Sequence, residues 1–191
     1  MTSSPRAPIV DLSFPRHWQT EILSARPLIL PSRHFVYPAD AEEVERGALE
    51  VLIRRAEAAQ PFLATCALGF RDAAVPTGLW ACPNPDEICA VSGGYAYLIS
   101  TIDPARFTMI SFRPVLEVRA VPSENLILFI GHFAILAWGV NGQAWESEKL
   151  SDEGITITSI EGAQLHGLGW NMISDKETPF TLDLKTGLRT T

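Results

Sequence analysis

After Pro61, apolar residues are spaced as in β-strands rather than helices. Short runs rich in Val, Ile, Tyr and Phe are separated by turn residues roughly every 8–12 positions, which is typical of an antiparallel meander. Ser92-Gly93-Gly94 and Asn141-Gly142 are the clearest hairpin turns, because such residues adopt the positive φ that tight hairpins need. The pattern predicts strands at 62–70, 78–81, 88–91, 95–101, 115–121, 126–130, 132–140, 143–147, 155–160 and 178–184.

The segment before Pro61 has helical spacing instead. Asp40 is a candidate N-cap with Glu43 three residues later, as in a capping box. Apolar side chains then recur on one face at Val44, Ala48, Leu52, Ala56 and Ala59. These features predict an amphipathic helix near residues 40–59, ended by Pro61.

Residues 1–38 contain six prolines and predict an arm that wraps the surface. Short apolar runs in it, such as Leu28-Ile29-Leu30, are expected to form single edge strands, where proline is tolerated. A chain of 191 residues then favours one mainly β domain over 1–191, with the arm at 1–38, the helix at 39–60 and the meander at 61–191.

A weak repeat lies inside the predicted meander. A shift of 38 residues places Gly93 on Gly131 and Tyr95 on Phe133. A period near 40 residues is typical of propeller blades with four short strands each. A closed propeller needs about four blades, and three such units fit in the meander, so a sandwich, an open barrel or association of chains stays open.

Leu128-Phe129-Ile130-Gly131, Ala137, Gly142 and Trp145 resemble the tryptophan-docking blade of quinoprotein-type β-propellers. Asp183-Leu184-Lys185-Thr186-Gly187 is similar to the turn that closes such blades. The resemblance implies a propeller-like fold, but no residues match the quinoprotein cofactor site, so no cofactor is expected. The chain as a whole also resembles a bacterial protein family, a resemblance that implies no particular activity.

Charge and composition limit the classes of partner that the protein is expected to bind. The formal net charge of −7 argues against nucleic acid or an anionic membrane surface. The absence of a long apolar run argues against a membrane span, and the N-terminus lacks the apolar core of a signal peptide. We therefore expect a cytoplasmic protein whose partner is another protein, a small molecule or a second copy of itself.

Trp138 and Trp145 are the candidate ligand-binding residues. If Asn141-Gly142 is a two-residue turn, Val140 faces Gln143, and two residues further along each strand the two indoles face each other. Paired indoles can stack on a sugar or another flat ligand. The alternative is a cross-strand aromatic pair that only stabilises the hairpin, by up to about 1 kcal/mol.

The three cysteines, Cys66, Cys82 and Cys89, suggest little chemistry. Cys82 and Cys89 could form a disulfide across a turn, or all three could be ordinary buried thiols. A structural zinc site needs four ligands, usually in two close pairs, and no second pair is recognisable. We therefore expect no metal.

No nucleophile elbow, phosphate loop, dinucleotide fingerprint or calcium loop is present in the sequence. The sequence thus favours a non-catalytic binding or protein-interaction module. The alternative is a small hydrolase or lyase that uses carboxylates and a histidine gathered from β-turn loops, with His132, His166, Glu146 and Asp175 as candidates.

Overall fold

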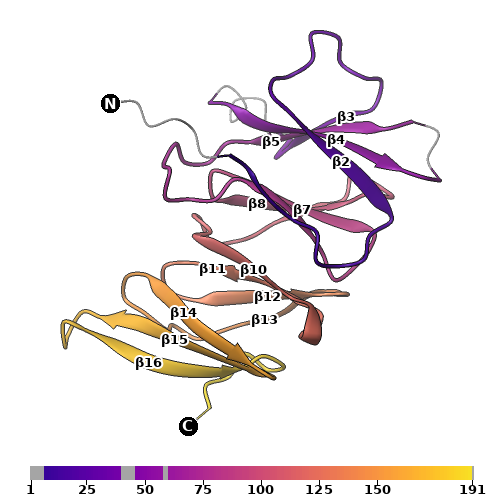
Figure 1. The fold of residues 1–191 in the computed structure, drawn as a ribbon. Coiled ribbons are helices and arrows are strands. Elements are labelled where there is room, and N and C mark those ends of the chain that lie inside the picture. Colours follow the sequence, from indigo (N-terminus) through magenta and orange to yellow (C-terminus); the bar gives the residue numbers. More distant parts are fainter. Residues whose placement is uncertain (1–6, 40–45, 58–59, 191) are drawn as a thin grey trace. The chain divides into compact units, whose positions relative to one another are not determined.

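The computed structural model describes residues 7–39, 46–57 and 60–190. The chain is mainly β, as predicted: in these ranges it forms sixteen strands, one 3₁₀ turn at Pro122–Glu124 and no α-helix (Figure 1). Contacts divide the chain into two compact units, residues 1–114 and 115–191. A single domain over the whole chain stays a prediction.

Unit 1 contains two sheets. One has the order β2-β4-β5-β3, in which β2 and β3 are the edges, and the other has the order β1-β6-β7-β8-β9. Neighbours are antiparallel except for the pairs β1–β6 and β3–β5. The strands are β1 (Ile9–Asp11), β2 (Trp18–Leu23), β3 (His34–Tyr37), β4 (Ala48–Arg55), β5 (Phe62–Ala67), β6 (Gly78–Ala81), β7 (Glu87–Ser92), β8 (Tyr95–Ser100) and β9 (Phe107–Met109).

The core of unit 1 is aromatic and aliphatic, and the hydroxyl groups of two buried tyrosines in it are hydrogen-bonded. Tyr37 is fully buried, and its hydroxyl donates to the backbone oxygen of Pro104 at 2.7 Å. The hydroxyl of Tyr97 donates to the oxygen of Ala67 at 2.9 Å. A buried phenol without such a partner would weaken the core, so these bonds fix both rings.

The predicted helix near 40–59 is wrong where the structure describes it. Residues 48–55 form strand β4, while 40–45 and 58–59 lie outside the described residues. Leu49, Val51 and Ile53 alternate with a period of two and are buried together, as in a strand that covers a core with one face. The same stretch also has apolar residues four apart, and pairing with β2 and β5 decides between the two patterns.

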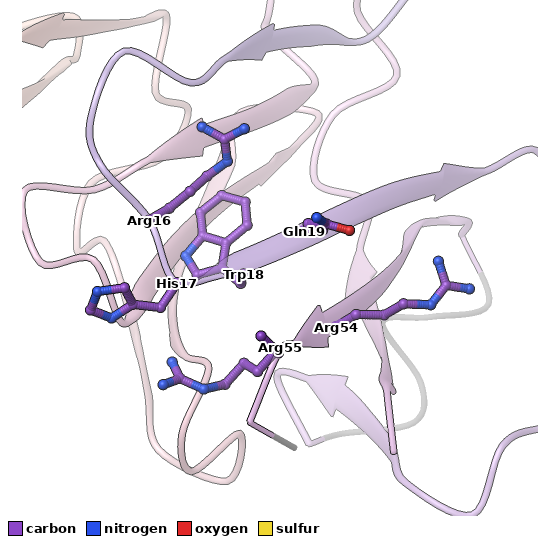
Figure 2. Close-up of a pocket in the computed structure, with 7 residues that line it drawn as sticks. Arg16, His17, Trp18, Gln19, Arg54 and Arg55 are labelled. Carbon is purple, nitrogen blue, oxygen red and sulfur yellow. The ribbon is translucent and has the colours of Figure 1, made fainter. Parts of the chain in front are cut away.

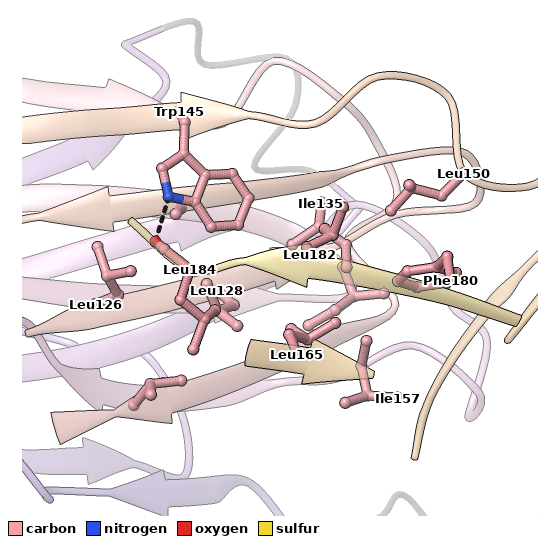
Figure 3. Close-up of a cluster of buried hydrophobic side chains, with 13 residues drawn as sticks. Leu126, Leu128, Ile135, Trp145, Leu150, Ile157, Leu165, Phe180, Leu182 and Leu184 are labelled. Carbon is pink, nitrogen blue, oxygen red and sulfur yellow. Dashed lines mark hydrogen bonds between the residues drawn. The ribbon is translucent and has the colours of Figure 1, made fainter. Parts of the chain in front are cut away.

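Unit 2 also contains two sheets, in the orders β10-β11-β12-β13 and β14-β15-β16. Figure 3 shows the apolar cluster that they share, in which Leu128 and Ile135 meet Leu165 and Leu182. All neighbouring strands in this unit are antiparallel. Its strands are β10 (Glu117–Val121), β11 (Leu126–Ile130), β12 (Ile135–Gly139), β13 (Gly142–Glu146), β14 (Ile155–Glu161), β15 (Gln164–Asn171) and β16 (Lys176–Asp183).

The 38-residue shift aligns strands with strands: β6, β7, β8 and β9 fall on or close to β10, β11, β12 and β13. Both series are antiparallel meanders, and none of the sheets is closed. The Ser92-Gly93-Gly94 hairpin is confirmed, because Gly93 and Gly94 have φ of 56° and 76° between β7 and β8. The propeller-blade resemblance remains one of sequence.

Leu28-Ile29-Leu30 does not form the expected edge strand. These residues lie in the loop between β2 and β3, which projects from its sheet (Figure 1). Leu28 and Ile29 are almost fully exposed. Pro27 and Pro31 flank the run and lack the N–H that strand pairing would use.

Candidate ligand-binding pocket

A pocket of about 620 Å³ opens in unit 1 where β2 begins and β4 ends. This volume lies in the range of small-molecule sites, ~300–1,000 Å³. Figure 2 shows its cationic side chains spread around it rather than gathered at one point. The lining residues are Arg16, His17, Trp18, Gln19, Arg54, Arg55 and Ala56.

The register between β2 and β4 explains how two distant segments meet. Trp18 lies opposite Arg55, and Gln19 lies opposite Arg54. Opposite residues share a face of the sheet and successive residues alternate faces. Arg55 therefore lies on the face that holds the buried Trp18, while Arg54 and Gln19 lie on the other, exposed face.

Arg55 is held firmly on the inner face. Its side chain is only 11% exposed, and its Nη1 donates to Asp86 Oδ1 at 2.5 Å and to Thr101 Oγ1 at 2.9 Å. The Thr101 hydroxyl donates in turn to the backbone oxygen of Asp86 at 2.9 Å. The hydrogen bond from Arg55 is the main reason why the pKa of Asp86 lies below its ordinary value.

His17 completes this network from the solvent side. Its Nδ1 lies 3.0 Å from Asp86 Oδ1, and its side chain is 60% exposed. Its backbone N–H donates to the oxygen of Pro85 at 3.1 Å, which ties the start of β2 to the same loop. Asp86 thereby orients the imidazole and leaves its Nε2 available to a ligand.

Trp18 forms the floor at the start of β2. It is 3% exposed, and its indole N–H donates to the oxygen of Glu87 at 3.0 Å. The guanidinium of Arg16 lies 5.8 Å from the centre of the indole ring, within the range of a cation–π contact. This contact places a positive charge above the buried ring.

Two of the arginines keep charge available for a ligand. Among the described residues, Arg16 has no ion pair, and Arg54 has one loose contact, 3.7 Å from Glu21 Oε2 with both side chains more than half exposed. An exposed pair of this kind contributes ~0–1 kcal/mol, so it competes weakly with a bound anion. The pocket can therefore bind negative groups on both faces of the sheet end.

The structure does not pair Trp138 with Trp145 as predicted. The turn is formed by Val140 and Asn141, so that Gly139 lies opposite Gly142, and a bulge follows. Trp145 then lies opposite Ala137 and Trp138 opposite Gln143, which puts the two indoles on opposite faces. Sequence counting failed because it assumed a turn one residue later and a regular ladder.

Both indoles are largely buried, at 7% and 8% exposure. Trp145 lies in the apolar cluster of unit 2, and its N–H donates to the oxygen of Leu184 at 2.7 Å (Figure 3). A ligand-binding role for Trp138 and Trp145 remains a prediction, and it would need two separate surfaces.

The four residues proposed for hydrolase or lyase chemistry all lie in unit 2. In the described part of the chain, no hydrogen bond or ion pair joins any two of them. His166, in β15, lies 3.0 Å from Thr181 Oγ1, and the ring of His132 contacts that of Phe133. Glu146 ends β13, and Asp175 lies in the turn before β16.

All three cysteines are free thiols and fully buried. Burial raises the pKa of Cys66, Cys82 and Cys89, which disfavours the thiolate that metal binding and oxidation require. The described residues contain no cluster of three or more His, Cys, Asp or Glu side chains that could hold a metal ion.

Sequence reasoning missed the pocket altogether. Its two halves, residues 16–19 and 54–56, fell in the expected arm and the expected helix. The one signal available was the pair of basic clusters, Arg16-His17 and Arg54-Arg55, in an acidic chain.

Comparison with known proteins adds little to this picture. No protein-family model matches the chain, and the comparison with curated proteins gives no match either. Among solved structures, the chain is similar to the crystal structure of Citrobacter koseri AztD, with a TM-score of 0.44 and 12% identity over 75% of this chain. The match spans 43% of that protein, less than half its length. Over the described residues, no helix is long and apolar enough to cross a membrane.

Proposed function

We propose that this protein is a non-catalytic binding module whose ligand is an anion held in the pocket where β2 begins and β4 ends. The observation that carries the proposal is that Arg16 and Arg54, neither of them in a tight ion pair with a described residue, line one pocket beside His17 in a chain of net charge −7. Charge concentrated against the overall sign of a protein attracts oppositely charged ligands and raises their local concentration.

The type of cation supports the same conclusion. The first 114 residues contain arginines but no lysine, and the three lysines follow later in the chain. Guanidinium groups bind carboxylates and phosphates through two parallel hydrogen bonds, which a lysine ammonium cannot do. The alternative of a small hydrolase or lyase stays a prediction.

Nuclear magnetic resonance titration of the full chain tests this proposal. Citrate and inorganic phosphate are added at constant ionic strength, and the backbone amides of residues 16–19 and 54–56 are followed. We expect saturable chemical-shift changes, and we expect the anion affinity derived from them to fall at least threefold in Arg16→Gln and in Arg54→Gln. Arg106→Gln is the matched control, since Arg106 is exposed in the same unit and does not line the pocket.

The outcome is decided by where and how the shifts saturate. Saturation at millimolar anion in the parent and in Arg106→Gln, but not in the two pocket variants, supports an anion site. Linear shifts without saturation, or equal weakening in all three variants, would show general charge screening and refute it.

A further inference from the structure

β2 is an edge strand with one unpaired side. It pairs with β4 along its whole length, and no described strand or backbone group pairs with its other side between Gln19 and Leu23. A free edge presents a row of N–H and C=O groups that can pair with another extended chain. At ~3.3 Å per residue, the five residues from Gln19 to Leu23 offer a row of about 17 Å.

β2 also lacks the devices that commonly protect an edge. It contains no proline, no lysine and no bulge, and its single charged residue is Glu21. Other described edges are shorter or interrupted: β1, β3, β9, β10 and β13 have three to five residues, the register of β14 shifts at 157–159, and β16 contains Pro179. β2 is therefore the edge best suited to accept a partner strand.

The cationic pocket lies at the beginning of this edge. A strand added to β2 would direct its successive side chains to alternate faces of the sheet. Arg54 lies on one face of the sheet end, and the Arg16 guanidinium lies over the ring of Trp18, which is on the other face. Acidic side chains at consecutive positions of the added strand would thus meet a cation on either face.

From this juxtaposition we infer that the free edge of β2 binds an extended segment of another protein, acidic at the end that reaches the pocket. The inference rests on the proposed anion site and assigns its ligand to a peptide. Backbone pairing supplies affinity, and the arginines select the acidic end. Glu21, halfway along β2, disfavours an acid opposite it, so the remainder of the segment is uncharged.

Short synthetic peptides test the inference on the full chain. Acetyl-Thr-Val-Thr-Glu-Glu-Glu-amide places its acids at the start of β2 if it adds antiparallel, and acetyl-Glu-Glu-Glu-Thr-Val-Thr-amide does so if it adds parallel. We expect one of the two to bind at least tenfold more tightly than free glutamate. We also expect amide hydrogen exchange in β2 to slow when it binds, because the edge N–H groups become paired.

Two controls separate backbone pairing from charge. The same peptide N-methylated at alternate residues keeps every charge but loses its pairing donors, and should bind at least tenfold more weakly. Replacement of the glutamates by glutamines, or Arg54→Gln in the protein, should also weaken binding at least threefold, while Arg106→Gln should not.

The outcomes distinguish this inference from the function on which it rests. If citrate saturates the pocket but the N-methylated peptide binds as well as the parent peptide, the anion site stands and strand addition is refuted. Equal affinity for hexathymidylate would assign the site to nucleic acid and overturn the peptide inference. If neither citrate nor the peptides bind, the anion site itself is refuted.

Discussion

Removing the hydrogen bond from Trp145 to the backbone of residue 184 tests how strongly this contact stabilises unit 2. The indole N–H donates to the Leu184 oxygen at 2.7 Å, and both residues are buried. Trp145→Phe removes this donor and leaves the buried Leu184 oxygen without a hydrogen-bond partner. It also leaves a gap beside Gly187, whose backbone packs closely against the indole.

The expected cost follows from these three changes. A neutral hydrogen bond contributes ~1 kcal/mol net, and a buried carbonyl left without a partner costs ~1–3 kcal/mol. The smaller ring also forfeits packing, at about 1 kcal/mol for a modest cavity. Because these contributions overlap, we expect the free energy of unfolding to fall by about 3 kcal/mol.

Urea denaturation followed by circular dichroism measures the loss, and hydrogen exchange of β15 shows that it falls in unit 2. Trp170→Phe is the matched control, since Trp170 is half-buried in the same unit and its indole N–H makes no hydrogen bond to the described residues. That variant should lose less than ~1 kcal/mol. Equal losses in the two variants would refute the role assigned to the Trp145 N–H.

Three further outcomes are expected from other sites. The pKa of Asp86 is lowered by Arg55 and His17. The ionised carboxylate therefore stabilises the folded state above the ordinary pKa of 3.8, and this stability is lost as the pH falls below that value. Asp86→Asn should therefore flatten the acid limb of a stability–pH curve measured by urea denaturation; an unchanged limb would contradict this. Glu50→Ala removes a 5%-exposed carboxylate that accepts hydrogen bonds from Arg26 at 2.8 Å and from Thr65 at 2.6 Å. It should lower the free energy of unfolding by about 2 kcal/mol in the same assay, whereas Glu21→Ala, at an exposed position, should lower it by less than ~0.5 kcal/mol. Ile29→Ser should change the melting temperature by less than about 2 °C, because Ile29 is 89% exposed; a larger drop in thermal unfolding would mean that the loop packs on something.

The β-meander could be predicted because its signals are local. Ser92-Gly93-Gly94 and the run 155–160 carry their turn chemistry and alternation within a few residues, and both are found where expected. β15 was missed because glycines at 167 and 169 interrupt its alternation. Those glycines are required by packing: a Cβ at Gly169 would lie 2.2 Å from the Leu150 oxygen.

β4 could not be predicted because its deciding interactions are distant in sequence. Glu50 looks like a solvent-facing helical residue, yet it is buried by Arg26 and Thr65, which are 24 and 15 residues away. The bulge near Trp138 is equally invisible to counting, because it depends on how β13 meets β12. Local patterns therefore located the hairpins but not the register between them.

The pocket shows the functional consequence of that limit. Arg54 and Arg55 are neighbours in sequence, and as helical residues they would both have faced solvent. As the last two residues of a strand they point to opposite faces, so that one neutralises Asp86 inside while the other stays available at the surface. Because residues 48–55 form a strand rather than the predicted helix, they pair with β2 and so form both the cationic pocket and the sheet whose free edge is β2. Binding along that edge would use the two features together.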